Sequence, residues 1–380
     1  MFDFPFNEAS VVTSIYCFVY YLILVYSNYQ DGLLEPFTYE ISLKKEVLTL
    51  FFTGLFIITH CLEGDFFHLM HHINDYSFIP GSYNFGEEIY HKIAFCVEKN
   101  YFLFRVIVWG GAFCLFCLTA KRMTVSVYYS VVLLIATHII TFCYARATAA
   151  MAVYFFGLSF FCSPLRNKLI SYIIGVLIIS FSLKFHNSAI IMLVMTMMFF
   201  FPIRIWSIIL VIIVFFLCSN IFKDLLMEIV LSENTDSIIA NKIDMYSQRQ
   251  IKHGLSGIIN RILQYASFYI PFIISTINIF RDDNFDFIPT SILRMYKVAS
   301  GLVLLSLLFY FLGPSFVTFV YRVLFMSMIP ITIVVVYLYQ SDLMSNSHYR
   351  WCVFSGIIYS VDMYLYVTYV TSLSSSVPNV

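Results

Sequence analysis

The sequence predicts an all-α, polytopic integral membrane protein with about twelve transmembrane helices and two external polar segments. Of its 380 residues, 60% are hydrophobic and 12% are charged, and the mean hydropathy is +0.84. A water-soluble fold cannot bury that much apolar surface. The apolar runs approach the bilayer-spanning length and lack the period-two alternation of a membrane β-barrel. We treat residues 1–380 as a single transmembrane domain.

Charge and cysteine content exclude several other classes. The 22 Lys and Arg residues balance the 22 Asp and Glu residues, so a nucleic-acid partner is not expected. The nine cysteines lie mostly in apolar stretches, and we interpret the pair Cys114 and Cys117 as helix-packing residues. The first cation is Lys44, so the basic start of a cleavable signal peptide is missing. The apolar stretch 11–26 is therefore expected to be a retained helix.

Each helix is placed by finding apolar stretches close to the length that crosses a bilayer. The following ranges meet this criterion, and some share narrow turns: 9–29, 46–62, 101–119, 123–143, 145–162, 168–184, 187–203, 204–222, 258–280, 292–312, 315–340 and 351–372.

The orientation follows from the cations in the short connections between these ranges. One alternate set of connections is basic and holds Lys44, Lys45, Lys121, Arg122, Arg166, Lys168, Arg204, Arg281, Arg294, Lys297 and Arg350. The other set is nearly free of cations, with Lys184 as an exception. Because basic connections stay in the cytoplasm, both termini and the polar segments 63–100 and 223–257 are predicted to face outward. A reaction centre would then open to the exterior.

The two polar segments hold most of the acid and histidine side chains that chemistry would need. Asp65 and Glu88 lie in the first segment and Arg249 lies in the second. The stretch 88–99 has the pattern of a short amphipathic helix on the membrane surface. Asp65, His68 and His72 have spacing compatible with Zn²⁺, but no accompanying motif supports a metal site, and we expect neither a metal nor a cofactor.

Among the arginines inside or at the outer start of predicted helices, three are candidates for a functional role: Arg146, Arg261 and Arg322. Placing Arg toward the bilayer centre is costly, so each of them needs a partner or a purpose. Guanidinium matches the geometry of phosphate with paired donors and keeps its charge. These residues are candidates for binding a pyrophosphate. The alternative is that they extend to the surface or pair with an acid for structural reasons.

His186 lies at the outer end of a predicted helix. An unperturbed histidine titrates near pH 6.5, which suits proton transfer at neutral pH. The alternative is a helix-boundary histidine that only satisfies backbone groups. The sequence contains no Gly-rich phosphate loop, no G-x-S-x-G and no H-E-x-x-H, so nucleotide chemistry in a cytoplasmic domain is not expected.

Several segments together resemble the EpsG family, which belongs with the Wzy-type polymerases of bacterial capsule, exopolysaccharide and O-antigen. The matching segments are Tyr144-Ala145-Arg146-Ala147-Thr148-Ala149-Ala150, Phe185-His186-Asn187-Ser188-Ala189, Gly64-Asp65, Glu87-Glu88 with Tyr90, Lys242-Ile243-Asp244-Met245-Tyr246 and Tyr321-Arg322. The Arg146 and His186 segments are the most specific. The chain departs from the family pattern just after Asp65, where Phe66, Phe67 and His68 replace an expected tyrosine.

The resemblance implies glycosyl transfer at the outer face of the bacterial inner membrane. The donor would be a glycan chain on undecaprenyl pyrophosphate, and the acceptor would be a repeat unit on a second lipid carrier. His186, Asp65 and Glu88 would be the catalytic candidates, and Arg146, Arg322, Arg261 and Arg249 would bind pyrophosphate. The expected partners are these substrates and the lipid bilayer, with a chain-length regulator as a further candidate.

Two alternatives from other classes remain open. A lipid-linked glycan transporter or flippase would also have many helices and buried cations, but it should show inverted repeats and broken helices in both halves, and neither is evident. A membrane-bound O-acyltransferase would use a histidine and an acid, but it usually draws on a cytoplasmic acyl donor, and the predicted cytoplasmic connections are short.

Overall fold

The computed structural model describes most of the chain from residue 43 onward. The described residues are 43–59, 88–97, 100–144, 147–186, 188–202, 204–218, 221, 255–281, 284–312 and 317–374. Every secondary-structure element within them is helical, which confirms the predicted all-α class for this part of the chain. The first predicted span, 9–29, and most of both external segments lie outside the described residues.

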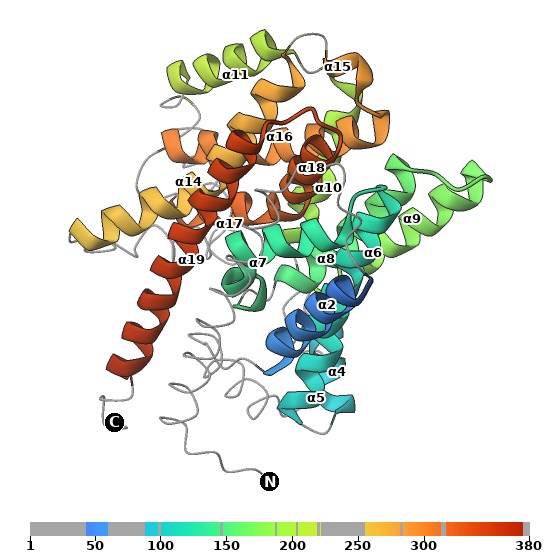
Figure 1. The fold of residues 1–380 in the computed structure, drawn as a ribbon, viewed down its shortest axis with the longest axis vertical. Coiled ribbons are helices and arrows are strands. Elements are labelled where there is room, and N and C mark those ends of the chain that lie inside the picture. The colour runs from blue at the N-terminus through green and yellow to red at the C-terminus, as the bar shows by residue number, and fades with distance from the viewer. Residues whose placement is uncertain are drawn as a thin grey trace.

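Apart from α4 and α15, the described helices lie within or close to the predicted apolar ranges from 46–62 onward (Figure 1). They are α2 (Leu43–Thr59), α4 (Glu88–Cys96), α5 (Tyr101–Arg105), the π-helix η1 (Val106–Gly110), α6 (Gly111–Arg122), α7 (Val127–Tyr144), α8 (Ala147–Cys162), α9 (Lys168–Ser182), α10 (Ser188–Thr196), the 3₁₀-helix η2 (Met197–Phe200), α11 (Ile205–Leu217), α14 (Leu255–Ile279), α15 (Asn284–Phe287), α16 (Thr290–Phe311), α17 (Val317–Met326), α18 (Met328–Gln340) and α19 (Asn346–Ser374).

The structure does not confirm the number of about twelve spans. Three described helices are long and apolar enough to cross a membrane: Leu103–Arg122, Ile262–Ile279 and Thr290–Phe311. A fourth span results if α17 and α18, which are bent by 44° at their junction, cross together. Several other apolar helices, including α8, α9 and α11, are only 10–17 residues long, because turns end them before the twentieth residue.

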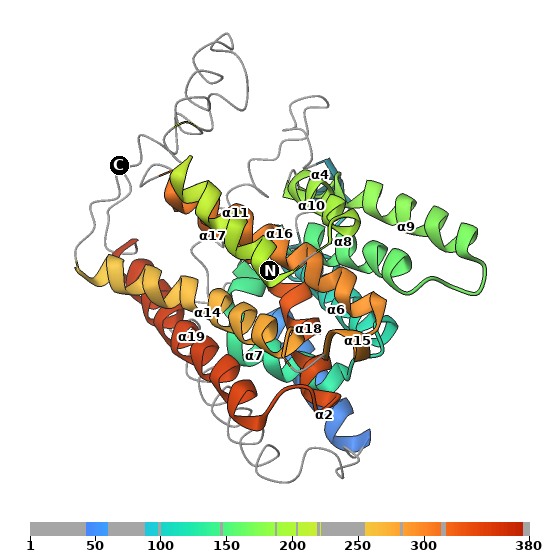
Figure 2. The ribbon, with the colours of Figure 1, turned by 90° about the horizontal axis from the view of Figure 1, so that it is seen from above.

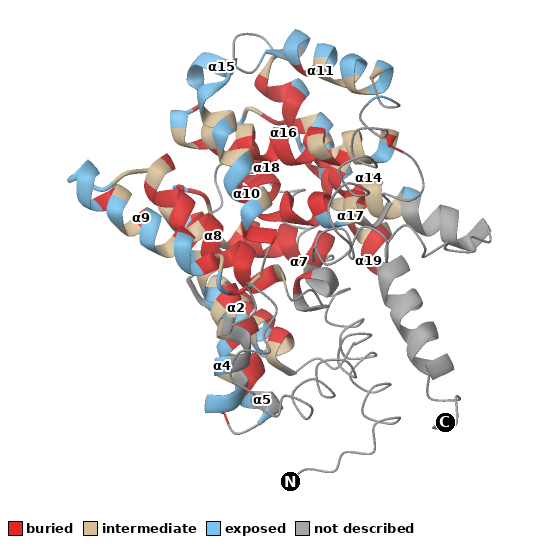
Figure 3. Ribbon diagram, turned by 180° about the vertical axis from the view of Figure 1, so that it is seen from behind, coloured by how far each residue is buried: buried red, intermediate tan, exposed pale blue. Residues whose placement is uncertain are grey.

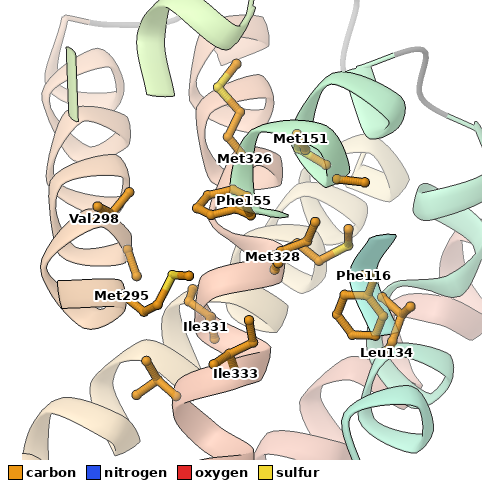
Figure 4. Close-up of a cluster of buried hydrophobic side chains, with 14 of the residues drawn as sticks. Phe116, Leu134, Met151, Phe155, Met295, Val298, Met326, Met328, Ile331 and Ile333 are labelled. Atoms are coloured by element: carbon orange, nitrogen blue, oxygen red, sulfur yellow. The ribbon is translucent and has the colours of Figure 1, made fainter. Parts of the chain in front are cut away.

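Helix α18 lies at the centre of the bundle. Its residues from Met328 to Val336 are all buried, and it contacts α7, α8, α14, α16, α17 and α19. A helix that is apolar on every side is stable only when other elements surround it. The core around it contains Phe116, Leu134, Met151, Phe155, Met295, Val298, Met326, Met328, Ile331 and Ile333 (Figure 4).

Helix α8 is also buried almost over its whole length, whereas α9 and α11 lie at the periphery (Figure 3). Large apolar side chains on both peripheral helices are exposed, among them Leu177 at 65% on α9 and Leu210 at 62% on α11. Exposed apolar faces of this kind are expected where helices contact lipid rather than water. The structure therefore supports a membrane protein.

Helices α8 and α9 form a tight antiparallel hairpin. A Cβ atom added to Gly157 would lie 3.1 Å from the carbonyl oxygen of Gly175, and one added to Gly175 would lie 2.5 Å from Cε2 of Phe161. Small residues at a helix interface let the two backbones approach closely. The Ser171 hydroxyl donates to the Phe160 carbonyl oxygen at 2.9 Å and holds the start of α9 against the end of α8.

Helices α7, α14 and α19 pack together on another side of α18 (Figure 2). Gly356 of α19 lies so close to α7 that an added Cβ would be 2.5 Å from Cα of Thr137. Ser360 donates to the Thr137 carbonyl oxygen at 3.1 Å. The buried ring of His138 stacks on Phe268 of α14 with centroids 4.3 Å apart.

Cationic side chains bind the C-terminal end of α8. The Arg122 guanidinium at the end of α6 donates from Nε to Ser159 Oγ at 2.9 Å and from Nη2 to the Ser163 carbonyl oxygen at 2.8 Å. It also lies over the Phe160 ring at 3.7 Å. A helix C-terminus carries a partial negative charge that favours cations, so Arg122 fixes the end of α6 beside the end of α8.

The start of α16 supplies two further cations at the same end of the bundle as Arg122. Arg294 Nη1 donates to the Phe161 carbonyl oxygen at 2.6 Å, and Lys297 Nζ donates to the Phe199 carbonyl oxygen at 3.2 Å. The first bond joins α16 to the end of α8, and the second joins it to η2. The beginning of α16 is therefore tied to two helix ends.

Neutral side chains complete this end of the bundle. Gln340 at the end of α18 donates to the Thr124 carbonyl oxygen at 2.9 Å and accepts from the Ser126 amide at 2.8 Å. Asn278 near the end of α14 hydrogen-bonds His348 at the start of α19 at 3.0 Å. We call this the basic end, because its connections carry Arg122, Arg166, Lys168, Arg281, Arg294, Lys297 and Arg350.

The close packing of α7 on α19 is testable through its glycine. Gly356→Ala should destabilise the bundle by about 2 kcal/mol, because the methyl group would overlap the α7 backbone. Gly111→Ala is the matched control, since an added Cβ there meets no atom within 4 Å. Thermal unfolding of the purified proteins in detergent measures the difference. Equal unfolding temperatures for wild type and Gly356→Ala would contradict the packing.

The basic end is predicted to lie in the cytoplasm. Single cysteines introduced at Ser82 and Asn234 in a cysteine-free chain should react with an impermeant thiol reagent in intact spheroplasts. A cysteine at Leu165, an exposed position in the α8–α9 connection, should react only after the membrane is opened. The reverse labelling pattern would place the basic end outside.

Candidate functional site

The candidate site lies at the end of the bundle opposite the basic end. Helices α8 and α9 are antiparallel, so the start of α8 and the α9–α10 turn share that end. Helix α4 begins against this turn, since the Ile89 amide donates to the Lys184 carbonyl oxygen at 3.2 Å. Through this bond, the backbone at Glu88 lies beside the turn that carries His186.

His186 lies two residues before the first residue of α10, Ser188, and is half-buried. The Ser188 amide donates to Nδ1 of His186 at 3.1 Å, and the Ser188 hydroxyl lies 3.0 Å from the same nitrogen. An amide N–H can only donate, so Nδ1 accepts and the proton of the neutral ring is on Nε2. In this arrangement His186 satisfies a helix N-terminal amide and carries an N–H group on its other nitrogen.

A contact between α8 and α10 fixes the position of His186 relative to the start of α8. The Tyr154 hydroxyl donates to the Met192 carbonyl oxygen at 2.9 Å and also contacts Thr196, which binds α8 directly to α10. Helix α8 begins at Ala147, directly after Arg146. Arg146 itself lies outside the described residues, and its predicted role stays a prediction.

Arg322 lies in the second turn of α17 and its side chain is exposed. From Arg322 the chain runs through the rest of α17 and all of α18 to Gln340 at the basic end. This path is eighteen residues long, or about 27 Å along the helix axes. Arg322 is therefore in the half of the bundle that contains His186. The neighbouring Tyr321 hydroxyl lies 3.2 Å from the Tyr359 hydroxyl and links α17 to α19.

The other predicted site residues are described only in part or not at all. Asp65 and Arg249 lie outside the described residues. Glu88 and Arg261 belong to α4 and α14, and only their backbone is described. Within the described residues, no group of three or more His, Cys, Asp or Glu side chains has a metal-binding arrangement, and the Asp65, His68 and His72 set lies outside them.

Arg105, which no sequence motif marks, is 2% exposed. Its Nη2 donates to the Ile57 carbonyl oxygen near the end of α2 at 2.8 Å, and its guanidinium lies 5.9 Å from the Trp109 ring centroid. It immediately precedes η1, and π-helical turns are frequent at functional sites. A cation a few residues inside the predicted span 101–119 is the signal that would have identified it.

His138 is a second buried polar residue that no sequence motif marks. It is 4% exposed, and its Nδ1 has no hydrogen-bond partner among the residues that the structure describes. It lies in the middle of the predicted span 123–143, where a polar group away from water needs a reason. Because it stacks on Phe268 near Tyr359, it contributes a polarisable ring to the contact of α7, α14 and α19.

Comparisons with known proteins give one finding. Residues 66–378 match the EpsG family. No curated protein and no solved structure matches the chain. The matched range includes Glu88, Arg146, His186 and Arg322 and begins directly after Asp65. Since the match covers well over half of the 380 residues, this chain belongs to the EpsG family.

Proposed function

We propose that this protein is a membrane glycosyltransferase that polymerises lipid-linked oligosaccharide repeat units for a bacterial surface polysaccharide. Membership in the EpsG family points to polysaccharide biosynthesis, and the exposed apolar helices fit a membrane location. The observation that carries the proposal is the match of residues 66–378 to the EpsG family. At one end of the matched bundle, the start of α4 contacts the α9–α10 turn that carries His186.

The proposed substrates are a glycan chain on undecaprenyl pyrophosphate and a repeat unit on a second such carrier. A hydroxyl of the acceptor sugar attacks the anomeric carbon of the donor, the bond to the pyrophosphate breaks, and lipid pyrophosphate leaves. The hydroxyl proton passes to a base. The leaving group supplies the driving force, so the protein needs to align the two substrates and stabilise the departing charge.

The cations of the candidate site suit the pyrophosphate. Arg322 reaches the exposed surface from α17, and Arg146 directly precedes α8. Both carry guanidinium groups that offer paired donors to phosphate oxygens. We propose the same role for Arg261 and Arg249. The site would face the periplasm across the inner membrane, as the charge distribution predicts.

His186 has two possible roles, and its hydrogen bonds favour one. With Nδ1 accepting from the Ser188 amide, the ring offers the Nε2–H group as a donor to a substrate oxygen. Action as a general base would require that hydrogen bond to break. We therefore propose His186 as a donor to the substrate and assign the base to an acid, with Glu88 on the adjoining α4 and Asp65 as candidates.

The lipid-linked glycan profile of a strain without this chain tests the function. A polymerase predicts that the ladder of chain lengths collapses to a single repeat unit on its lipid. Full-length polymer held inside the cell would instead indicate transport, and full-length exported polymer that lacks acyl groups would indicate an acyltransferase. Either of these results would overturn the proposal.

The donor role of His186 predicts different results for two substitutions. His186→Ala should reduce polymerisation by about 10²-fold, whereas His186→Gln, whose amide can still donate, should retain most of the activity. Quantifying the ladder at equal protein level gives the measurement. If His186→Gln lost as much polymerisation activity as His186→Ala, the donor role would be contradicted and His186 would be assigned as the general base.

His348→Ala is the matched control. This histidine is also half-buried and hydrogen-bonded, but it lies at the basic end beside Asn278. Its loss should leave the ladder within about twofold of wild type, since removing one hydrogen bond costs only about 1 kcal/mol of stability. A large effect there would show that the assay reports folding rather than chemistry.

A further inference from the structure

Arg294 and Lys297 at the basic end are two neighbouring cations that form no ion pair with a carboxylate in the described part of the chain. They lie one turn apart on α16 and repel each other. Each donates to a neutral carbonyl, at Phe161 and Phe199. No ion pair joins either of them to a carboxylate among the described residues. A guanidinium has five N–H donors and an ammonium three, so these two bonds use a small part of their capacity.

The carbonyl partners do not balance this charge. A helix C-terminus carries only about half an elementary negative charge, and the end of α8 already accepts from Arg122 as well. Both α16 cations are half-buried, where the dielectric is lower than in water and repulsion between like charges is stronger. An anion placed between the two side chains would relieve this repulsion.

The surface beside the pair is strongly apolar. Phe199, which accepts the Lys297 hydrogen bond, is flanked by Phe200 at 82% exposed and Phe201 at 58% exposed. Met197 in the same short helix is 61% exposed. An anion that is small and fully hydrated gains nothing from such side chains. A ligand with a phosphate next to hydrocarbon gains from both surfaces.

We propose that Arg294 and Lys297 bind the phosphate of an anionic phospholipid whose acyl chains lie against Met197, Phe200 and Phe201. The bidentate guanidinium matches two phosphate oxygens, and the ammonium serves as a point charge beside them. Basic pockets between helices at the cytoplasmic face of membrane proteins bind headgroups of this kind. The site is separate from the His186 end and independent of the proposed glycosyl transfer.

Binding of phosphatidylglycerol to the purified full-length chain tests the proposal. The protein is placed in a neutral detergent, phosphatidylglycerol or phosphatidylcholine is titrated in, and native mass spectrometry counts the lipids that remain bound. Wild type should retain phosphatidylglycerol in preference to phosphatidylcholine. The double variant Arg294→Gln with Lys297→Gln should bind phosphatidylglycerol at least about tenfold more weakly, since each cation near an anionic headgroup adds to affinity.

The matched control is Arg166→Gln with Lys168→Gln. It removes one exposed cation from the α8–α9 connection and another from the first residue of α9, both at the basic end. This variant should bind phosphatidylglycerol as wild type does. If both double variants lost phosphatidylglycerol binding equally, the binding would depend on general surface charge, and this result would overturn the site. Displacement of the lipid by millimolar inorganic phosphate would also overturn it, because the site would then recognise free phosphate.

A measurement on the unmodified chain covers the case in which the double variant does not fold. Hydrogen–deuterium exchange is compared in phosphatidylcholine nanodiscs with and without phosphatidylglycerol. The anionic lipid should slow amide exchange in η2 and the first turns of α16, and should leave α9 unchanged. Unaltered exchange in η2 and α16 would overturn the proposal.

Discussion

Pairing of cationic side chains with helix-end carbonyls is the interaction on which this bundle depends. Only 12% of the residues are charged, and among the described residues the bonds of Arg122 and Arg294 go to neutral oxygens rather than to carboxylates. Arg122 and Arg294 both bind the end of α8, and Arg105 binds a carbonyl near the end of α2. Each bond joins two helices and reaches a carbonyl in or just beyond the last described turn of a helix, where partners within the helix run out.

These bonds also determine which helix ends meet. With α6, α8, η2 and α16 tied at the basic end, the turn between α9 and α10 must lie at the other end, together with the start of α8. The buried α18 fills the space between the ends with apolar side chains and no charge. The two ends therefore differ chemically: one carries Arg122, Arg294 and Lys297, and the other carries His186 and the start of α4.

His186 illustrates how local geometry refines a chemical assignment. A histidine at a helix boundary reads from the sequence as either a base or a structural cap. The hydrogen bond from the Ser188 backbone N–H shows that His186 caps α10 through Nδ1. Because Nδ1 accepts this bond, the proton of the neutral ring is on Nε2. Capping and substrate binding are thus compatible in one ring, because each uses a different nitrogen.

The sequence by itself determined the helical class, the membrane character and nearly every described helix, because apolar runs and their interruptions are local properties. It also identified the family through the Arg146 and His186 segments. It overestimated the length of several helices, whose ends depend on caps and turns such as the Asn167 side chain that accepts from the Ile170 amide. Only the tertiary structure revealed the contact of Ile89 with Lys184, the burial of Arg105 and the carbonyl partners of Arg294 and Lys297. Those features join residues far apart in the chain, and no local pattern encodes such a distance.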